Sequence, residues 1–130
     1  MKIFVADDSA RLCEQITGML SGLSEIEIVG QAQDARSATQ AIYKLKPDVV
    51  TLDLYLSGGS GIEVLKKIKQ KNIVPCVIML TNHSSLPYRK TCMEVGADFF
   101  FDKSTELRKV KEVIQSLVEG FHSTAPKPER

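Results

Sequence analysis

The chain has 130 residues, with 17 Lys and Arg against 16 Asp and Glu, and 43% of the residues are hydrophobic. This length suits one domain of about 100 to 150 residues and leaves no room for a second effector domain of ordinary size. The net charge of +1 argues against direct nucleic-acid binding, because a nucleic-acid-binding face carries clustered Lys and Arg. No apolar run is long enough for a signal peptide or a membrane span.

The cysteines give no sign of a disulfide framework or a zinc site. Cys13, Cys76 and Cys92 are odd in number and widely spaced, and they lack a C-x-x-C pair. We therefore expect them to be small buried hydrophobes, as in proteins of the reducing cytoplasm, and we predict a cytoplasmic protein.

Short apolar runs rich in β-branched and aromatic residues alternate with helix-period segments along the chain. This rhythm predicts an α/β fold of βα units around a parallel sheet. The runs predicted as strands are Ile3–Ala6, Ile26–Val29, Val49–Leu52, Cys76–Leu80 and Ala97–Phe101. Because they are apolar at consecutive positions, we expect both faces of the sheet to be covered.

Each predicted strand is followed by a segment with apolar residues at helical spacing. The predicted helix starts are Ser9, Asp34, Gly61, the Ser84–Pro87 segment and Ser104. After Gly120 the periodicity disappears. We expect one domain over residues 1–120 and a mobile C-terminal tail or linker stub over residues 121–130.

Polar residues stand where four of the predicted strands end. They are Asp7 and Asp8, then Asp53, then Thr81 and Asn82, and finally Lys103. In an open parallel sheet these ends meet at one edge, where ligands bind. Three neighbouring carboxylates repel one another, and Mg2+ relieves this repulsion because it prefers oxygen ligands. Asp7 and Asp8 fit a loop and helix-cap pair about equally well.

These residues resemble the receiver domain of two-component response regulators, as in chemotaxis regulators. The likeness consists of Asp-Asp after the first strand, Asp after the third, Thr after the fourth and Gly-Ala-Asp-x-Phe-x-x-Lys at the fifth. It covers residues 1 to about 120. It implies a flavodoxin-like, doubly wound sheet of five parallel strands in the order 2-1-3-4-5, flanked by five helices.

The resemblance implies a role for each polar residue of this edge. Asp53 would accept a phosphoryl group from the phosphohistidine of a histidine kinase or phosphotransfer protein. Asp7, Asp8, Asp53 and the backbone carbonyl of Tyr55 would hold Mg2+. Lys103, the Thr81 hydroxyl and the backbone amides of Tyr55 and Asn82 would contact the phosphoryl group.

The resemblance also implies an output. Thr81 and the aromatic residue Phe100 would switch the surface of the fourth helix, fifth strand and fifth helix, and so control a partner, an effector domain or a homodimer. The chain would then be a signalling switch and not an enzyme. Several positions depart from the family. Among them, Phe100 replaces the usual Tyr, and Ser104 follows Lys103 where Pro is common. A cis peptide would be costly there without Pro.

Other functions remain as alternatives. A degenerate receiver would act only as a docking module. An aspartyl-nucleophile phosphatase would want a second acid two residues after Asp53, where this chain has Tyr55. A dinucleotide-binding domain would want G-x-G-x-x-G after the first strand. Since Tyr55 and His83 are bulky and stand beside the predicted acceptor site, we also expect slow self-dephosphorylation.

Overall fold

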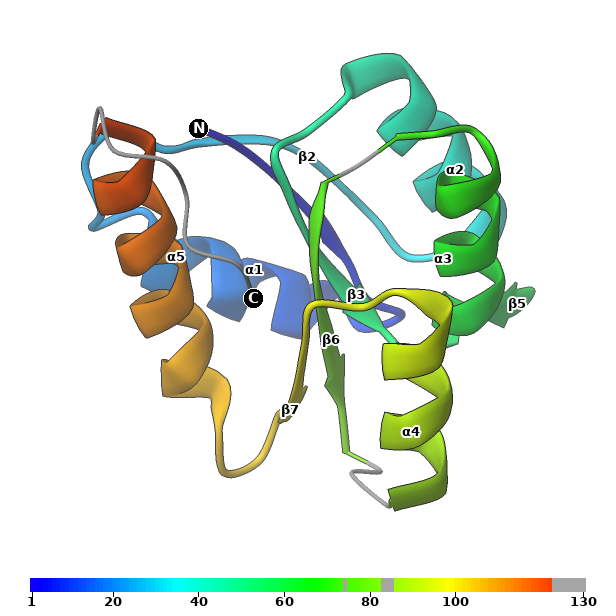
Figure 1. Ribbon diagram of the computed structural model, residues 1–130. Coiled ribbons are helices and arrows are strands. Elements are labelled where there is room, and N and C mark those ends of the chain that lie inside the picture. The colour runs from blue at the N-terminus through cyan, green and yellow to red at the C-terminus, as the bar shows by residue number, and fades with distance from the viewer. Residues whose placement is uncertain (74, 83–85, 123–130) are drawn as a thin grey trace.

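The computed structural model describes residues 1–73, 75–82 and 86–122, and its centre is a five-stranded parallel sheet (Figure 1). The strand order is β2-β1-β3-β6-β7. These strands are β1 (Lys2–Ala6), β2 (Glu27–Ala32), β3 (Val49–Asp53), β6 (Cys76–Thr81) and β7 (Phe99–Asp102). β4 and β5 form a separate two-stranded hairpin, so β6 and β7 are the fourth and fifth strands of the main sheet. The predicted order 2-1-3-4-5 is therefore confirmed.

Helices cover both faces of the sheet, as the apolar strands predict. They are α1 (Ala10–Leu20), α2 (Ala35–Leu45), α3 (Gly61–Gln70), α4 (Leu86–Val95) and α5 (Leu107–His122). In Figure 1, α1 and α5 lie on one side of the sheet and α2, α3 and α4 lie on the other. The molecule therefore has three layers, and each face of the sheet has its own hydrophobic core.

Successive residues of the strands enter opposite cores, because side chains alternate across a sheet. Residues that form the core on the α1 and α5 side include Ile3, Val5, Ile16, Leu20, Ile78, Leu80, Val110 and Ile114. Residues that form the core on the other side include Phe4, Ile42, Val50, Leu52, Leu65, Ile68, Val77 and Met79. Cys13, Cys76 and Cys92 are buried free thiols, as predicted.

Polar side chains begin three of the helices by accepting an otherwise unpaired backbone N–H. The Ser9 hydroxyl accepts from Leu12 at 3.2 Å, and the Asp34 carboxylate accepts from Ser37 at 2.8 Å. Both predicted caps are thereby confirmed. Ser60 caps α3, of which Gly61 is the first residue. The predicted start of the fourth helix at Ser84 and Ser85 lies outside the described residues.

The prediction that Ser104 begins the last helix is wrong, since α5 begins at Leu107. The hydroxyl and the backbone N–H of Ser104 both donate to the Asp102 carboxylate, at 2.6 and 2.8 Å, so Ser104 stabilises a turn after β7. The described residues contain no cis peptide, so the Lys103–Ser104 bond is trans. At its other end α5 continues to His122, two residues past Gly120.

A short hairpin after β3 has no counterpart in the sequence-based prediction. Its strands are β4 (Tyr55–Leu56) and β5 (Gly59–Ser60), and the turn between them contains Gly58 at φ 71°. This positive φ is readily adopted by glycine. Among the described residues, no helix combines the length and the apolar character needed to cross a membrane.

Candidate functional site

The carboxyl ends of β1, β3, β6 and β7 bring the predicted polar residues to one edge of the sheet. Asp7 follows β1, Asp53 ends β3, Thr81 ends β6 and Lys103 follows β7. Because β3 lies between β1 and β6, Asp53 stands at the middle of this edge. The predicted convergence of acids, a hydroxyl and an amine is therefore what the fold produces.

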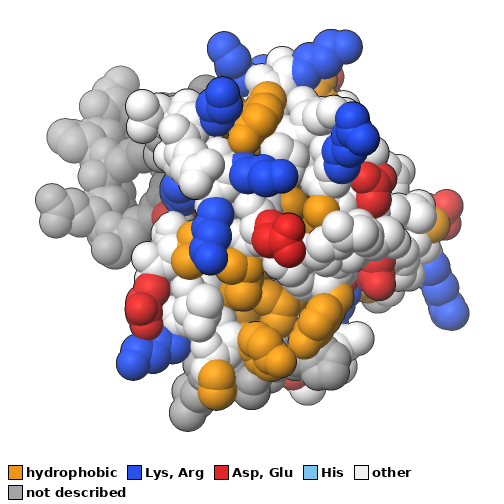
Figure 2. Space-filling view, turned by 90° about the vertical axis from the view of Figure 1, so that its right-hand side faces the viewer, with side chains coloured by type: hydrophobic (Ala, Val, Ile, Leu, Met, Phe, Trp, Pro, Cys, Tyr) orange, Lys and Arg blue, Asp and Glu red, His pale blue; other side chains and the backbone are white. Residues whose placement is uncertain are grey.

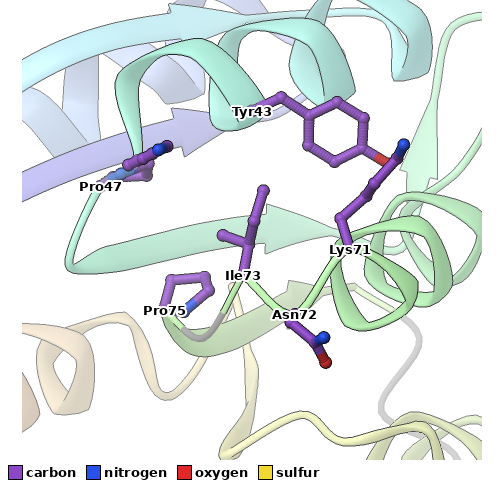
Figure 3. Close-up of a pocket in the computed structure, with 7 residues that line it drawn as sticks. Tyr43, Pro47, Lys71, Asn72, Ile73 and Pro75 are labelled. Atoms are coloured by element: carbon purple, nitrogen blue, oxygen red, sulfur yellow. The ribbon is translucent and has the colours of Figure 1, made fainter.

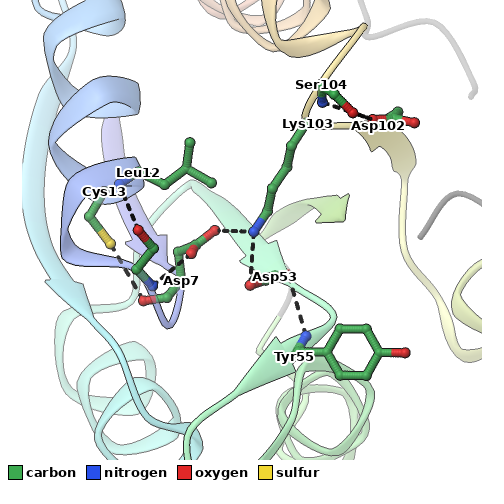
Figure 4. Close-up of polar contacts among 9 residues, drawn as sticks. Asp7, Leu12, Cys13, Asp53, Tyr55, Asp102, Lys103 and Ser104 are labelled. Carbon is green, nitrogen blue, oxygen red and sulfur yellow. Dashed lines mark hydrogen bonds and ion pairs between the residues drawn. The ribbon is translucent and has the colours of Figure 1, made fainter. Parts of the chain in front are cut away.

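Lys103 joins two of the acids (Figure 4). Its Nζ lies 2.7 Å from Asp7 Oδ2 and 2.9 Å from Asp53 Oδ2. The exposed fractions of the three side chains are 9% for Lys103, 1% for Asp7 and 3% for Asp53. Charges this deeply buried are costly unless they are paired, so the ammonium and the two carboxylates depend on one another.

Asp7 is held from two directions. Its Oδ1 accepts a hydrogen bond from the Ser9 N–H at 2.9 Å, while its backbone carbonyl accepts from the Cys13 Sγ at 3.6 Å. The first contact shapes the turn that leads into α1. Asp7 therefore stabilises the loop before α1 and also pairs with Lys103 beside Asp53. The loop interpretation and the metal-site interpretation of Asp7 are compatible.

The pKa values of this cluster reflect burial working against charge pairing. Burial raises the pKa of Asp53 to about 6; Asp7 adds to this, whereas the hydrogen bond and charge of Lys103 act in the opposite direction. Burial likewise raises the pKa of Asp7, despite Lys103 and the Ser9 N–H. For Lys103, burial lowers the pKa, but the hydrogen bonds and charges of Asp7 and Asp53 outweigh this effect and raise it.

The third acid, Asp8, is exposed and completes a group of carboxylates that suits a divalent cation. One oxygen each of Asp7, Asp8 and Asp53 lie within 4.8 Å of one another. The buried pair carries more negative charge than one lysine neutralises, and all the ligand atoms are hard oxygens. The donor set therefore fits Mg2+, which binds through one or two carboxylates and retains several waters.

The chain around Asp53 is fixed by backbone contacts. The Tyr55 N–H donates to Asp53 Oδ1 at 3.3 Å, and the Gly61 N–H donates to the Leu54 carbonyl at 2.8 Å. A Cβ on Gly61 would clash with the Asp53 carbonyl oxygen. Only glycine allows the start of α3 to approach β3 this closely. The sequence marks Gly61 only as a helix start, so this role is visible only in the structure.

The end of β6 helps to position Lys103. The Lys103 N–H donates to the carbonyl of Thr81 at 3.0 Å. Thr81 is fully buried, whereas the next residue, Asn82, is exposed in a bend. Phe100 is also buried, and the Arg89 guanidinium lies 5.9 Å from the centre of its ring. The two predicted switch residues thus both start from buried positions.

The Tyr55 side chain does not cover Asp53. In Figure 4 its ring points away from Asp53. It is 43% exposed and meets Tyr88 of α4 edge-on, with 6.4 Å between ring centres. A hydrogen bond with Tyr88, together with some burial, raises the pKa of the Tyr55 phenol. His83, the other predicted shielding residue, lies outside the described residues.

Comparison with known proteins gives matches along nearly the whole chain. Residues 3–115 match the family model of the response regulator receiver domain. A protein-glutamate methylesterase/protein-glutamine glutaminase of Halalkalibacterium halodurans is 34% identical over 134 aligned positions. This alignment covers 98% of the chain but 39% of that relative. The chain therefore spans about two fifths of the length of this curated relative.

Solved structures show the same fold. The response regulator domain of Thermotoga maritima CheB aligns with a TM-score of 0.80 and 26% identity, covering 97% of this chain and 98% of that one. A chain from the CheX-CheY-BeF3-Mg+2 complex of Borrelia burgdorferi aligns with a TM-score of 0.82 and 25% identity. That alignment covers 91% of this chain and 89% of the other.

Proposed function

Because this chain belongs to the response regulator receiver family, we propose that it is a signalling switch that accepts a phosphoryl group on Asp53. The observation that carries the proposal is the pairing of Lys103 with the carboxylate at the middle of the sheet edge, at 2.9 Å. This places a cation beside the oxygen that would attack phosphorus, where it can offset negative charge in the transition state.

The phosphoryl donor would be the phosphohistidine of a histidine kinase or phosphotransfer protein. As the bond from phosphorus to an Asp53 oxygen forms, the bond from phosphorus to the donor nitrogen breaks and the imidazole leaves. At neutral pH a carboxyl with a pKa of about 6 is mostly ionised, so Asp53 needs no general base. Lys103, the Thr81 hydroxyl and the amides of Tyr55 and Asn82 would bind the equatorial oxygens.

Asp7, Asp8, Asp53 and the backbone carbonyl of Tyr55 would hold Mg2+ in this site. When bound, this ion would neutralise charge on the phosphoryl oxygens. The grouping of three carboxylate oxygens within 4.8 Å supports this assignment. Asp8, as the exposed member, would be the first of the three to meet a hydrated ion. Asp7 would act mainly through water, since Lys103 and Ser9 already engage its two oxygens.

The output would be a change in the surface made by α4, β7 and α5. We propose that Thr81 is drawn towards the phosphorylated Asp53 and that the packing of Phe100 changes with it. The burial of both side chains supports this, because a packed core shifts between discrete arrangements. The target would be a downstream protein, an effector domain or a second copy of the chain. The receiver unit would end with α5, and the remaining residues would form a tail or linker.

Phosphorylation with a small donor tests the proposal. The protein is incubated with MgCl2 and acetyl phosphate and its intact mass is measured. We expect one added phosphoryl group in the wild type and none in Asp53→Asn. Asp34→Asn is the matched control. Asp34 follows β2, which β1 separates from β3, and Asn can still cap α2. An unmodified wild type would favour the docking module. An adduct that persists in Asp53→Asn would show that another residue is the acceptor.

A further inference from the structure

A hollow of about 630 Å³ lies at the edge of the sheet opposite Asp53 (Figure 3). It is bordered by the segments that lead into the first residues of β3 and β6, beyond the ends of α2 and α3. Its size falls within the range of about 300 to 1,000 Å³ that is usual for binding pockets. The hollow is not lined by the carboxylates of Asp7, Asp8 and Asp53, so it is separate from the proposed metal and phosphorylation site.

This first hollow has an apolar wall that is already formed. Pro47 and Pro75 are buried and Ile73 is half-buried. Figure 3 shows the Tyr43 ring across the hollow from Ile73 and Pro75. The Tyr43 hydroxyl donates to the Lys67 carbonyl at 3.0 Å, which fixes the ring against α3. A guest side chain would therefore enter without the cost of ordering this wall.

A second hollow of about 400 Å³ lies between α2 and α3, and it shares the lining residue Tyr43 with the first. It reaches Gly58 in the turn of the β4–β5 hairpin. We call the two hollows together the α2–α3 groove. The groove follows two helices, and an 11-residue helix such as α2 is about 16 Å long. This elongated shape suits a peptide segment better than one compact ligand.

The groove is locally basic. Its charged lining residues are Arg36, Lys46, Lys67, Lys71 and Glu63, all of them exposed. Four cations against one acid give +3, whereas the whole chain carries +1. Within residues 1–73, 75–82 and 86–122, none of the four cations forms an ion pair. Figure 2 shows Lys and Arg side chains distributed over this side of the molecule, which carries α2, α3 and α4.

We propose that the α2–α3 groove binds an acidic segment of a partner protein. One apolar or aromatic side chain of the segment would sit in the first hollow against Tyr43, Ile73 and Pro75. Its carboxylates would lie against the four cations. Charge complementarity favours an acidic peptide. The lack of stacked exposed rings along the described part of the groove disfavours a nucleic acid. The site goes beyond the proposed function, because neither hollow is lined by Asp53 or Lys103.

Binding of a fluorescent synthetic peptide tests the proposal. The probe is an eight-residue peptide with a central Phe among Glu and Asp residues, and its anisotropy is measured with the full chain. We expect the double variant K46E/K71E to weaken binding at least 10-fold. The control K66E/K90E changes the net charge equally with exposed lysines outside the groove, and should change the affinity less than 2-fold. Asp53→Asn should bind the peptide like the wild type.

Three further measurements complete the test. Replacing the Phe of the probe by Ala should weaken binding at least 5-fold. Tyr43→Phe should weaken it less than this, because the ring stays while the hydroxyl that fixes it to the Lys67 carbonyl is lost. Amide chemical shifts should move at Tyr43, Asn72 and Ile73. Absence of binding, equal losses in both double variants, or shifts confined to the Asp53 edge would overturn the proposal. Tighter binding of a single-stranded oligonucleotide or of a Lys-containing version of the probe would do so too.

Discussion

Lys103 Nζ lies 2.9 Å from Asp53 Oδ2 at a point where both side chains are almost fully buried. The same ammonium contacts Asp7 at 2.7 Å, so one positive charge serves two carboxylates. Desolvation of the second negative charge is therefore only partly compensated. The site holds excess negative charge before any ligand binds. Burial is the main cause of the raised pKa of Asp53, and the charge of Asp7 adds to it. The excess negative charge fits a divalent cation.

The first prediction concerns the stability of the metal-free protein. Burial raises the pKa of Asp53 from 3.8 to about 6, so the folded state binds more protons than the unfolded state between these values. The free energy of unfolding should therefore fall as the pH rises through this range, by on the order of 2 to 3 kcal/mol from this group. Urea denaturation in EDTA at about pH 4.5 and pH 7.5 measures the change.

The matched comparison is with Asp53→Asn, which cannot ionise. We expect this variant to be more stable than the wild type near pH 7.5, and the difference should shrink towards pH 4. Asp34 and Glu106 have lowered pKa values, caused mainly by hydrogen bonds with Ser37 and Lys109 respectively. They lose stabilising interactions as the pH falls, but equally in both proteins. Parallel pH profiles for the two proteins would contradict the prediction.

The second prediction concerns Mg2+. Adding MgCl2 should raise the melting temperature, because a ligand that binds only the folded state stabilises it by about 2.7 kcal/mol at 100 times Kd. Asp8→Asn is the informative variant. Asp8 is exposed, so the substitution should leave the metal-free melting temperature nearly unchanged but remove most of the shift. KCl at equal ionic strength is the control. A full shift in Asp8→Asn would remove Asp8 from the ligand set.

The strand order was predicted from the resemblance to receiver domains. The convergence of Asp7, Asp53 and Lys103 was predictable from the residues themselves, because apolar runs followed by polar residues define the edge of a parallel sheet. The start of α5 was not. Ser104 is a good cap by type, but its hydroxyl bonds to Asp102, and this competition between two local polar contacts is not encoded in helical periodicity. The direction of the Tyr55 ring depends on Tyr88, which is distant in the sequence.

The third prediction concerns Lys103→Ala. Removing the ammonium should slow phosphoryl uptake from acetyl phosphate by about 100-fold or more, because a buried charge that stabilises the transition state is lost. Lys109→Ala is the control, since Lys109 is an exposed lysine that pairs with Glu106. The measurement is the rate of adduct formation by mass spectrometry. Circular dichroism first establishes that the variant folds, because two buried carboxylates lose their partner. Equal rates in the two variants would exclude the proposed role.

The fourth prediction concerns the close approach of α3 to β3. Gly61→Ala should destabilise the fold by about 1 to 3 kcal/mol, because its Cβ would clash with the Asp53 carbonyl oxygen. Gly18→Ala in α1 should have the opposite effect. Apart from the adjoining residues and the backbone of α1 itself, no atom lies within 4 Å of a Cβ built there. Alanine favours a helix interior by up to about 1 kcal/mol over glycine. Urea midpoints measure both changes, and a destabilising Gly18→Ala or a neutral Gly61→Ala would contradict this account.

The last prediction concerns the lifetime of the phosphorylated form. The Tyr55 backbone is tied to Asp53 Oδ1, while its ring rests on Tyr88, away from the carboxylate. Shielding by Tyr55 therefore requires the ring to turn towards Asp53 once the phosphoryl group is attached. If it does so, Tyr55→Ala should shorten the lifetime about 10-fold, which corresponds to about 1.4 kcal/mol of the hydrolysis barrier.

The control for this prediction is Tyr55→Phe, which keeps the ring but not the hydroxyl and should retain the wild-type lifetime. The decay of the adduct is followed by intact mass after removal of the phosphodonor. A wild-type lifetime of seconds that Tyr55→Ala leaves unchanged would show that the ring stays on Tyr88. Water would then reach the phosphoryl group freely, and the exposed position of the ring in the unphosphorylated protein would persist in the phosphorylated one.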